Sequence, residues 1–120
     1  MKVLVVDDSK IARMSVIKSL KEIVPDAEAL QATNGLEALE IFQKERPRVV
    51  FLDLTMPVMD GYEALKRIME IDKAAQVIVV SADIQSEAKL RVLVAGAKNM
   101  YPKPINHEIM KLIFEKDLLV

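Results

Sequence analysis

Residues 49–53 read VVFLD, an unbroken row of four apolar side chains followed at once by an acid. The same pattern occurs twice more, as VLVVDD at residues 3–8 and, with a serine in place of the acid, as VIVVS at residues 77–81. Runs that are apolar at every position, rather than at alternate positions, are typical of parallel strands that are covered on both faces. The sequence therefore predicts three central strands of a parallel sheet, each ending in polar side chains.

Helix-length segments connect these strands. Apolar side chains recur in them at intervals of three and four residues, which is the spacing of one buried helix face. The predicted helices are residues 9–23, the segment from the Asn34-Gly35 turn to Glu45, residues 61–71, residues 84–95 and residues 106–116. In the first helix this spacing places Ile11, Met14, Ile17 and Leu20 on the apolar face.

Two weaker strands complete the pattern, at residues 27–32 and 99–102. Pro102 cannot donate to a neighbouring strand, and residues 27–32 have little β-propensity, so we expect both strands at the edges of the sheet. Alternating strands and helices are the signature of α/β proteins. The predicted architecture is a five-stranded parallel sheet in the flavodoxin-like order 2-1-3-4-5, with five helices on both faces.

The composition limits the classes of protein to which this chain can belong. Its 120 residues fit one domain, and 17 basic against 18 acidic residues give a net charge of −1, which offers no attraction for nucleic acid or an anionic membrane. No stretch approaches the roughly 20 apolar residues of a membrane span. With no Cys and one His, we expect a reducing, cytoplasmic location and, for any metal, a hard cation on oxygen ligands.

Polar residues that follow the predicted strands meet at one edge of the sheet. They are Asp7 and Asp8 after the first strand, Asp53 after the third, Ser81 after the fourth and Lys103 after the fifth. Ligands of such sheets bind at this edge, where the strand order reverses. Three carboxylates this close do not all ionise easily without a cation, and Mg²⁺ is the simplest one. Lys103 and Ser81 fit the oxygens of a phosphoryl group, and a carboxylate here is a candidate nucleophile that forms an aspartyl phosphate.

Each of these residues also has a purely structural interpretation. Asp8 can cap the first helix, Ser81 can be a turn residue, and Lys103 can be a solvated charge. Their coincidence at the same end of one predicted sheet favours the functional interpretation.

The sequence also resembles a known family, the receiver domain of two-component response regulators, in the single-domain, CheY-like form of chemotaxis regulators. The matching motifs run in the family's order: VVDD (5–8), DLTMPVMDG (53–61), SAD (81–83), AGA (95–97) and KPI (103–105). The resemblance covers nearly the whole chain and implies that residues 1–120 form one receiver domain, a phosphoprotein of a two-component phosphorelay.

The resemblance implies a role for each site residue. Asp53 would accept a phosphoryl group from the phosphohistidine of a histidine kinase or a phosphotransfer protein. A Mg²⁺ cofactor would be held by the following groups: Asp8, Asp53, the backbone carbonyl of Thr55 and, through water, Asp7. Lys103 would bridge to the phosphoryl oxygens, Ser81 would move to hydrogen-bond them, and the peptide bond before Pro104 is expected to be cis. Apart from its own phosphorylation and dephosphorylation, the chain would catalyse nothing.

The sequence departs from the family at the residue that usually completes the switch. That position lies three residues before Lys103 and usually holds Tyr or Phe, but here it is Met100. Tyr101 is one place further along, which in a strand means the opposite face. We therefore expect Met100 to occupy the space of the usual aromatic ring.

A face for a downstream protein is a further expectation. The helix at 84–95 carries one apolar stripe of Ala88, Val92 and Ala95 and a second of Leu90, Leu93, Val94 and Ala97. A helix on a sheet needs only one such stripe. The second indicates either a deeply covered helix or a partner-binding face shared with residues 99–102 and 106–116.

Two alternatives remain beside the single-domain interpretation. The chain can be the receiver fragment of a larger multidomain regulator or hybrid kinase. A phosphohydrolase of the haloacid dehalogenase type also uses Asp, Ser or Thr, Lys and paired acids. In that family, however, the nucleophile comes first along the chain, whereas here the paired Asp7 and Asp8 precede Asp53.

Overall fold

The strands form one parallel sheet in the order β2-β1-β3-β4-β5, which confirms the predicted architecture. A computed structural model describes residues 1–83 and 85–119. In chain order the elements are β1 (Lys2–Val6), α1 (Lys10–Ile23), β2 (Glu28–Ala32), α2 (Gly35–Glu45), β3 (Val49–Leu52), α3 (Gly61–Ile71), β4 (Gln76–Ser81), α4 (Ser86–Val94), β5 (Asn99–Pro102), α5 (His107–Leu112) and a π-helical turn, η1 (Ile113–Asp117).

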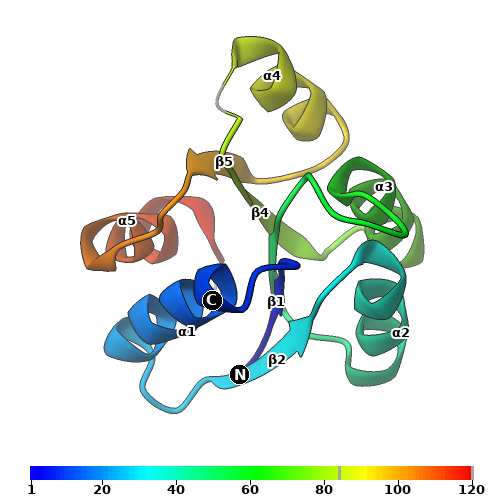
Figure 1. Ribbon diagram of the computed structural model, residues 1–120. Helices are drawn as coiled ribbons and strands as arrows, with labels where there is room; N and C mark the ends of the chain where they lie inside the picture. Colours follow the sequence, from blue (N-terminus) through cyan, green and yellow to red (C-terminus); the bar gives the residue numbers. More distant parts are fainter. Residues whose placement is uncertain (84, 120) are drawn as a thin grey trace.

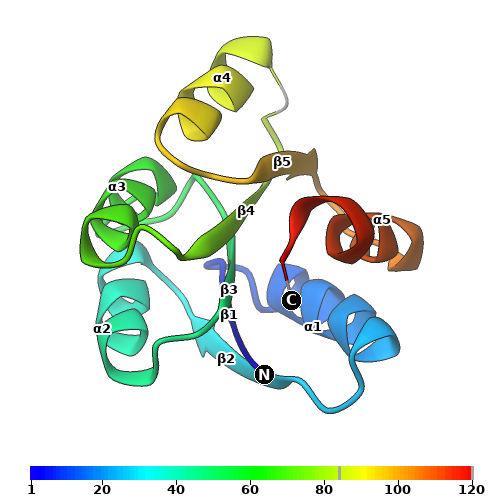
Figure 2. The same ribbon diagram turned by 180° about the vertical axis from the view of Figure 1, so that it is seen from behind.

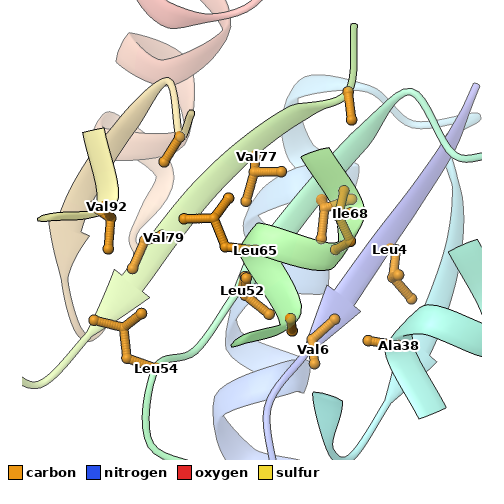
Figure 3. Packing of buried hydrophobic residues seen from close by; sticks show 14 of the residues in the cluster. Leu4, Val6, Ala38, Leu52, Leu54, Leu65, Ile68, Val77, Val79 and Val92 are labelled. Carbon is orange, nitrogen blue, oxygen red and sulfur yellow. The ribbon is translucent and has the colours of Figure 1, made fainter. Parts of the chain in front are cut away.

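Helices cover both faces of this sheet, with α1 and α5 on one side and α2, α3 and α4 on the other (Figures 1 and 2). Successive strand residues point to opposite faces, so the continuous apolar strands supply both cores. Leu4 and Val6 pack beneath α2 and α3 in the cluster of Figure 3, whereas Val3 and Val5 belong to the cluster under α1 and α5. Both layers are needed because each central strand is buried on its two faces.

Side-chain caps fix where most of the helices begin. Ser9, Asn34, Asp60 and Asn106 each accept a hydrogen bond from the backbone N–H three residues later, which satisfies a donor that the helix itself leaves unpaired. The helix α4 begins at Ser86 without such a cap. After α4, Gly96 adopts a positive φ of 114°, the left-handed conformation that favours glycine at a helix end.

Two predicted helices differ from the structure by more than one residue at an end. The helix predicted at 84–95 is α4 at Ser86–Val94, and Ile84 lies outside the described residues. The helix predicted at 106–116 is shorter as an α-helix, since α5 ends at Leu112 and the chain continues as η1. The apolar pattern did not indicate the change of helical form, because Ile113 is buried in η1 as it would be in a continued α-helix.

The first turn of α1 differs from its predicted packing. Ile11 is 84% exposed and Met14 is also exposed, although both have helical spacing with the buried Leu20. This turn lies at the carboxyl edge of the sheet, where Ile11 lines a groove with Pro104 rather than packing on a strand.

Among the described residues, no helix is long and apolar enough to cross a membrane.

The two apolar stripes of α4 separate clearly in the structure. Ala88 and Val92 are buried against the sheet, whereas Leu90 and Val94 are 64% and 80% exposed. Ala97, predicted in the outer stripe, is buried because the chain has already turned back toward β5. The deeply covered helix is therefore the wrong one of the two interpretations.

Candidate functional site

Backbone hydrogen bonds between strand ends bring the predicted residues to one edge of the sheet. The Asp7 N–H donates to Ala32 at 3.1 Å, and the Asp53 N–H donates to the Val6 carbonyl at 3.0 Å. At the far side of β4, the Lys103 N–H donates to the carbonyl of Ser81 at 3.0 Å. Because parallel strands end at the same edge of the sheet, the backbones of Asp7, Asp53 and Lys103 lie at neighbouring positions.

Three carboxylates gather at this edge. One oxygen each of Asp7, Asp8 and Asp53 lies within 4.8 Å of the others. Asp7 and Asp53 are each 5% exposed, whereas Asp8 is exposed. The cluster is therefore buried on the sheet side and open to solvent beside Asp8.

Lys103 is the cation that reaches into this cluster. Its Nζ lies 2.6 Å from Oδ2 of Asp7 and 3.3 Å from Oδ1 of Asp53. Burial alone lowers the pKa of the amine, but the hydrogen bond to Asp7 and the charges of Asp53 and Asp7 outweigh it, so the pKa is raised. Lys103 is held in its charged form between the two buried acids.

For Asp53, burial and the neighbouring acid outweigh the effect of Lys103 on the pKa. Burial raises the pKa of its carboxyl above the ordinary value, and the neighbouring Asp7 charge raises it further, while Lys103 lowers it only in part. The charged form of Asp53 is therefore incompletely compensated by the protein. A cation supplied from solution would complete the compensation.

Asp7 is fixed at both ends of its carboxylate. Its Oδ1 accepts a hydrogen bond from the Ser9 N–H at 2.9 Å, and its Oδ2 forms an ion pair with Nζ of Lys103 at 2.6 Å. Ser9, and not Asp8, caps α1, since its hydroxyl accepts the Ala12 N–H at 3.2 Å. The alternative that Asp8 serves as the helix cap is thus wrong.

The loop after Asp53 carries Thr55, which is exposed. Its ends are held by backbone contacts, because the Gly61 N–H donates to the Leu54 carbonyl at 2.9 Å and the Gly35 N–H donates to the Met59 carbonyl at 2.9 Å. A Cβ on Gly61 would overlap the Asp53 carbonyl oxygen. Glycine is required there because α3 begins directly against the strand end that bears Asp53.

Ser81 is buried at the end of β4, and its hydroxyl accepts the Asp83 N–H at 3.0 Å. Met100 is buried in the cluster on the α4 side of the sheet. Tyr101 lies on the other side, where its hydroxyl bonds to Asp117. The peptide bond between Lys103 and Pro104 is cis.

Sequence reasoning missed Arg13. Its Nη1 donates to the Asp7 carbonyl at 2.9 Å, and its Nε donates to Oε1 of Gln31 on β2 at 2.9 Å. The sequence shows a basic residue in the first turns of the helix after Asp8. It does not show which oxygen that residue reaches.

The donor set of the cluster fits a hard divalent cation. Its ligand atoms are carboxylate oxygens, and the exposed side at Asp8 leaves room for water or phosphate oxygens. Mg²⁺ usually takes one or two carboxylates together with such ligands. Acids beside a lysine at the switch point of a 2-1-3-4-5 sheet are suited to hold a metal and a phosphoryl group together.

Comparison with known proteins supports the same class. The sequence model of the response regulator receiver domain matches residues 3–115. The chain therefore belongs to the response regulator receiver domain family, and it is a phosphoacceptor module of two-component signalling.

Within that family the chain is similar to chemotaxis proteins. It is 42% identical over 106 residues to the chemotaxis protein CheY of Thermotoga maritima, covering 86% of this chain and 85% of that protein. The structure of the chemotaxis response regulator CheY4 of Vibrio cholerae superposes with a TM-score of 0.86 at 32% identity, covering 98% of both chains. A chain of the CheX–CheY–BeF3–Mg complex of Borrelia burgdorferi gives 0.83 at 30% identity, covering 99% of this chain and 90% of that one.

Proposed function

We propose that Asp53 is the residue of this receiver that accepts the phosphoryl group. The observation that carries the proposal is the placement of a buried, incompletely compensated carboxylate beside Lys103 at 3.3 Å, within a cluster of two further acids. Asp7 is engaged by Ser9 and Lys103, and Asp8 lies exposed at the solvent side. Asp53 is left as the nucleophile.

The metal of this site is Mg²⁺ in our proposal. Asp8 and Asp53 would bind it directly with the backbone carbonyl of Thr55, and Asp7, whose two oxygens are already engaged, would act through water. When bound, Mg²⁺ would neutralise the carboxylates and the phosphoryl oxygens. The solved CheX–CheY complex named above contains Mg²⁺ with a beryllofluoride group, which supports this choice.

The phosphoryl donor is a phosphohistidine of a histidine kinase or a phosphotransfer protein. A carboxylate oxygen of Asp53 attacks phosphorus, the bond from phosphorus to the imidazole nitrogen breaks, and the electron pair of that bond leaves with the imidazole. Lys103 places its positive charge where the equatorial oxygens of the phosphoryl group carry negative charge. Beyond this transfer and the hydrolysis of its own acyl phosphate, the chain would catalyse no reaction.

Phosphorylation changes the conformation through Ser81. Its hydroxyl now bonds to the Asp83 N–H, so a turn toward the phosphoryl group breaks that bond at the start of the segment leading to α4. Met100 fills the neighbouring core in place of an aromatic ring, and its flexible side chain has no hydroxyl to hold it outward. The conformational change is therefore passed mainly through residues 82–86 and α4.

The output is a protein–protein interaction in the cytoplasm, of the chemotaxis type or a similar one. The exposed Leu90 and Val94 on α4 lie on the face that the conformational change would alter. This face, continued by β5 and α5, is the proposed docking site for the downstream protein. Similarity to CheY proteins supports the assignment.

Phosphorylation by a small donor tests the proposal. With Mg²⁺ and acetyl phosphate, the wild-type protein should gain one phosphoryl group that is stable in acid and labile in base, and a chelator should prevent it. Asp53→Asn should abolish this gain, whereas Asp60→Asn should retain it, because asparagine also caps α3. Undiminished phosphorylation of Asp53→Asn would exclude Asp53 as the acceptor.

A further inference from the structure

Arg13 on α1 connects three elements beside the acidic cluster. Its half-buried guanidinium donates through Nη1 to the Asp7 carbonyl at the end of β1 and through Nε to Gln31 on the edge strand β2. The ladder between β1 and β2 ends here, because Val6 and Ala32 are its last residue pair and the Asp7 N–H donates to the Ala32 carbonyl. Arg13 thus supplies a side-chain donor to a carbonyl at the point where the ladder stops.

The carbonyl of Asp7 and the N–H of Asp8 belong to one planar peptide group. A hydrogen bond that fixes the Asp7 oxygen therefore fixes the plane from which the Asp8 backbone continues. Asp7 itself is held by Ser9 and Lys103 as well, whereas Asp8 is exposed and has a carboxylate oxygen within 4.8 Å of those of Asp7 and Asp53. The orientation of this carboxylate depends on the peptide plane before it.

We propose that Arg13 is a positioning residue for the metal, which holds the Asp7–Asp8 peptide so that the Asp8 carboxylate faces Asp53. The proposal rests on the proposed function, because it assumes that Asp8 binds Mg²⁺. Gln31 assists by holding the second edge of the guanidinium.

Two possible roles of Arg13, a nearby charge or a group that positions Asp8, predict opposite effects on Mg²⁺ affinity. A cation beside a metal site repels Mg²⁺, so an arginine that acted only through its charge would weaken metal binding, and its removal would tighten it. An arginine that positions Asp8 strengthens metal binding, and its removal weakens it. The sign of the change in Mg²⁺ affinity therefore separates the two.

The experiment is a calorimetric titration of the full chain with Mg²⁺ for wild type, Arg13→Gln, Arg13→Lys and Gln31→Ala. The expected loss of affinity is about 10-fold or more for Arg13→Gln, as found for groups that orient metal ligands. Arg13→Lys retains one donor and should fall between wild type and Arg13→Gln, and Gln31→Ala should lose less. Lys10→Gln removes the same charge from an exposed position of α1 and should stay within about twofold of wild type.

A double variant shows whether Arg13 acts through Asp8. In an Asp8→Ala background, titrated at higher Mg²⁺ concentration, Arg13→Gln should cause no further loss. Melting temperatures without metal identify a misfolded variant, and Arg13→Lys and Gln31→Ala replace Arg13→Gln if it does not fold. Unchanged or tighter Mg²⁺ binding by Arg13→Gln overturns the inference, as does an undiminished effect without Asp8. A wild-type protein that binds no Mg²⁺ overturns the proposed function itself.

Discussion

At the residue scale, Lys103 is the group on which the metal-free site depends. It contacts Asp7 and Asp53, two buried acids whose repulsion nothing else in the described site offsets so directly. Replacing one partner of a buried charge group leaves the other charges uncompensated, which is costly. The same lysine that would bind the phosphoryl group therefore also stabilises the protein before phosphorylation.

Tyr101 gives a prediction about pH. Burial, followed by the hydrogen bond to Asp117 and its charge, raises the pKa of Tyr101 from 10.0 to about 12. A phenol whose pKa is raised in the folded state contributes stability below pH 10.0 and loses it as the pH rises to about 12, because the unfolded chain ionises first. The stability difference between wild type and Tyr101→Phe, measured by urea unfolding, should therefore shrink across this interval. A constant difference would show that Tyr101 has the same pKa in both states.

The site residues differ in how far the sequence alone could place them. The sequence alone predicts a cluster of Asp7, Asp8, Asp53 and Lys103, because each follows a strand and parallel strands end at one edge. It does not predict the contact of Arg13 with the Asp7 carbonyl, since that contact depends on how α1 is rotated against β2. Every residue has a backbone carbonyl, so the sequence does not indicate which one accepts a side-chain hydrogen bond.

At the element scale, α4 is a weakly anchored helix beside the site. It begins without a side-chain cap, and Ala88 and Val92 are its buried residues. Arg91 links it to α3, since the guanidinium carbon lies 3.7 Å from the centre of the Tyr62 ring. Tyr62 follows Gly61, which is packed against the Asp53 carbonyl, so this contact joins α4 to the end of β3 where Asp53 lies.

Loss of this contact should loosen α4 selectively. A cation–π contact at an exposed position contributes about 0.5–1 kcal/mol, so in Arg91→Ala the amides of α4 should exchange with solvent about two- to fivefold faster. Arg67→Ala is the matched control, because it removes an exposed arginine that pairs with Glu63 within α3. Equal exchange in Arg91→Ala and wild type would mean that α4 is held by its buried face alone.

The elements themselves were largely predictable, with instructive exceptions. The bounds of β3 and α3 match the prediction because turn residues and caps mark their ends. The exposure of Ile11 was not predictable from spacing, because the sequence does not show where the sheet beneath a helix ends. The π-helical turn after α5 was missed for a related reason, since its apolar Ile113 is buried just as an α-helical residue would be.

At the scale of the whole molecule, the parallel sheet both builds the core and concentrates negative charge at one edge. The strand order that buries β1, β3 and β4 also brings Asp7, Asp8 and Asp53 together. Like charges at this edge oppose folding, and a cation that binds only the folded state reverses the effect. Stability and metal binding are thus linked through the topology.

This linkage predicts a stability change on metal removal. Mg²⁺ at about 100 times its dissociation constant should stabilise the wild-type protein by about 2.7 kcal/mol, and a chelator should remove this gain. Asp8→Ala should abolish most of the Mg²⁺ effect while raising the melting temperature of the metal-free protein, because one repelling carboxylate is gone. The measurement is thermal unfolding of both proteins with Mg²⁺ and with chelator. Equal Mg²⁺ stabilisation of the two would remove Asp8 from the metal site.

Chemical mapping of the acyl phosphate shows whether Asp53 carries the phosphoryl group. Borohydride reduces an aspartyl phosphate to homoserine, which marks the modified residue permanently. After phosphorylation of the wild-type protein with acetyl phosphate and Mg²⁺, peptide mass spectrometry should find homoserine at position 53. Homoserine at Asp7, Asp8 or Asp60 instead, or a phosphorylated protein without homoserine at position 53, would show that Asp53 is not the acceptor.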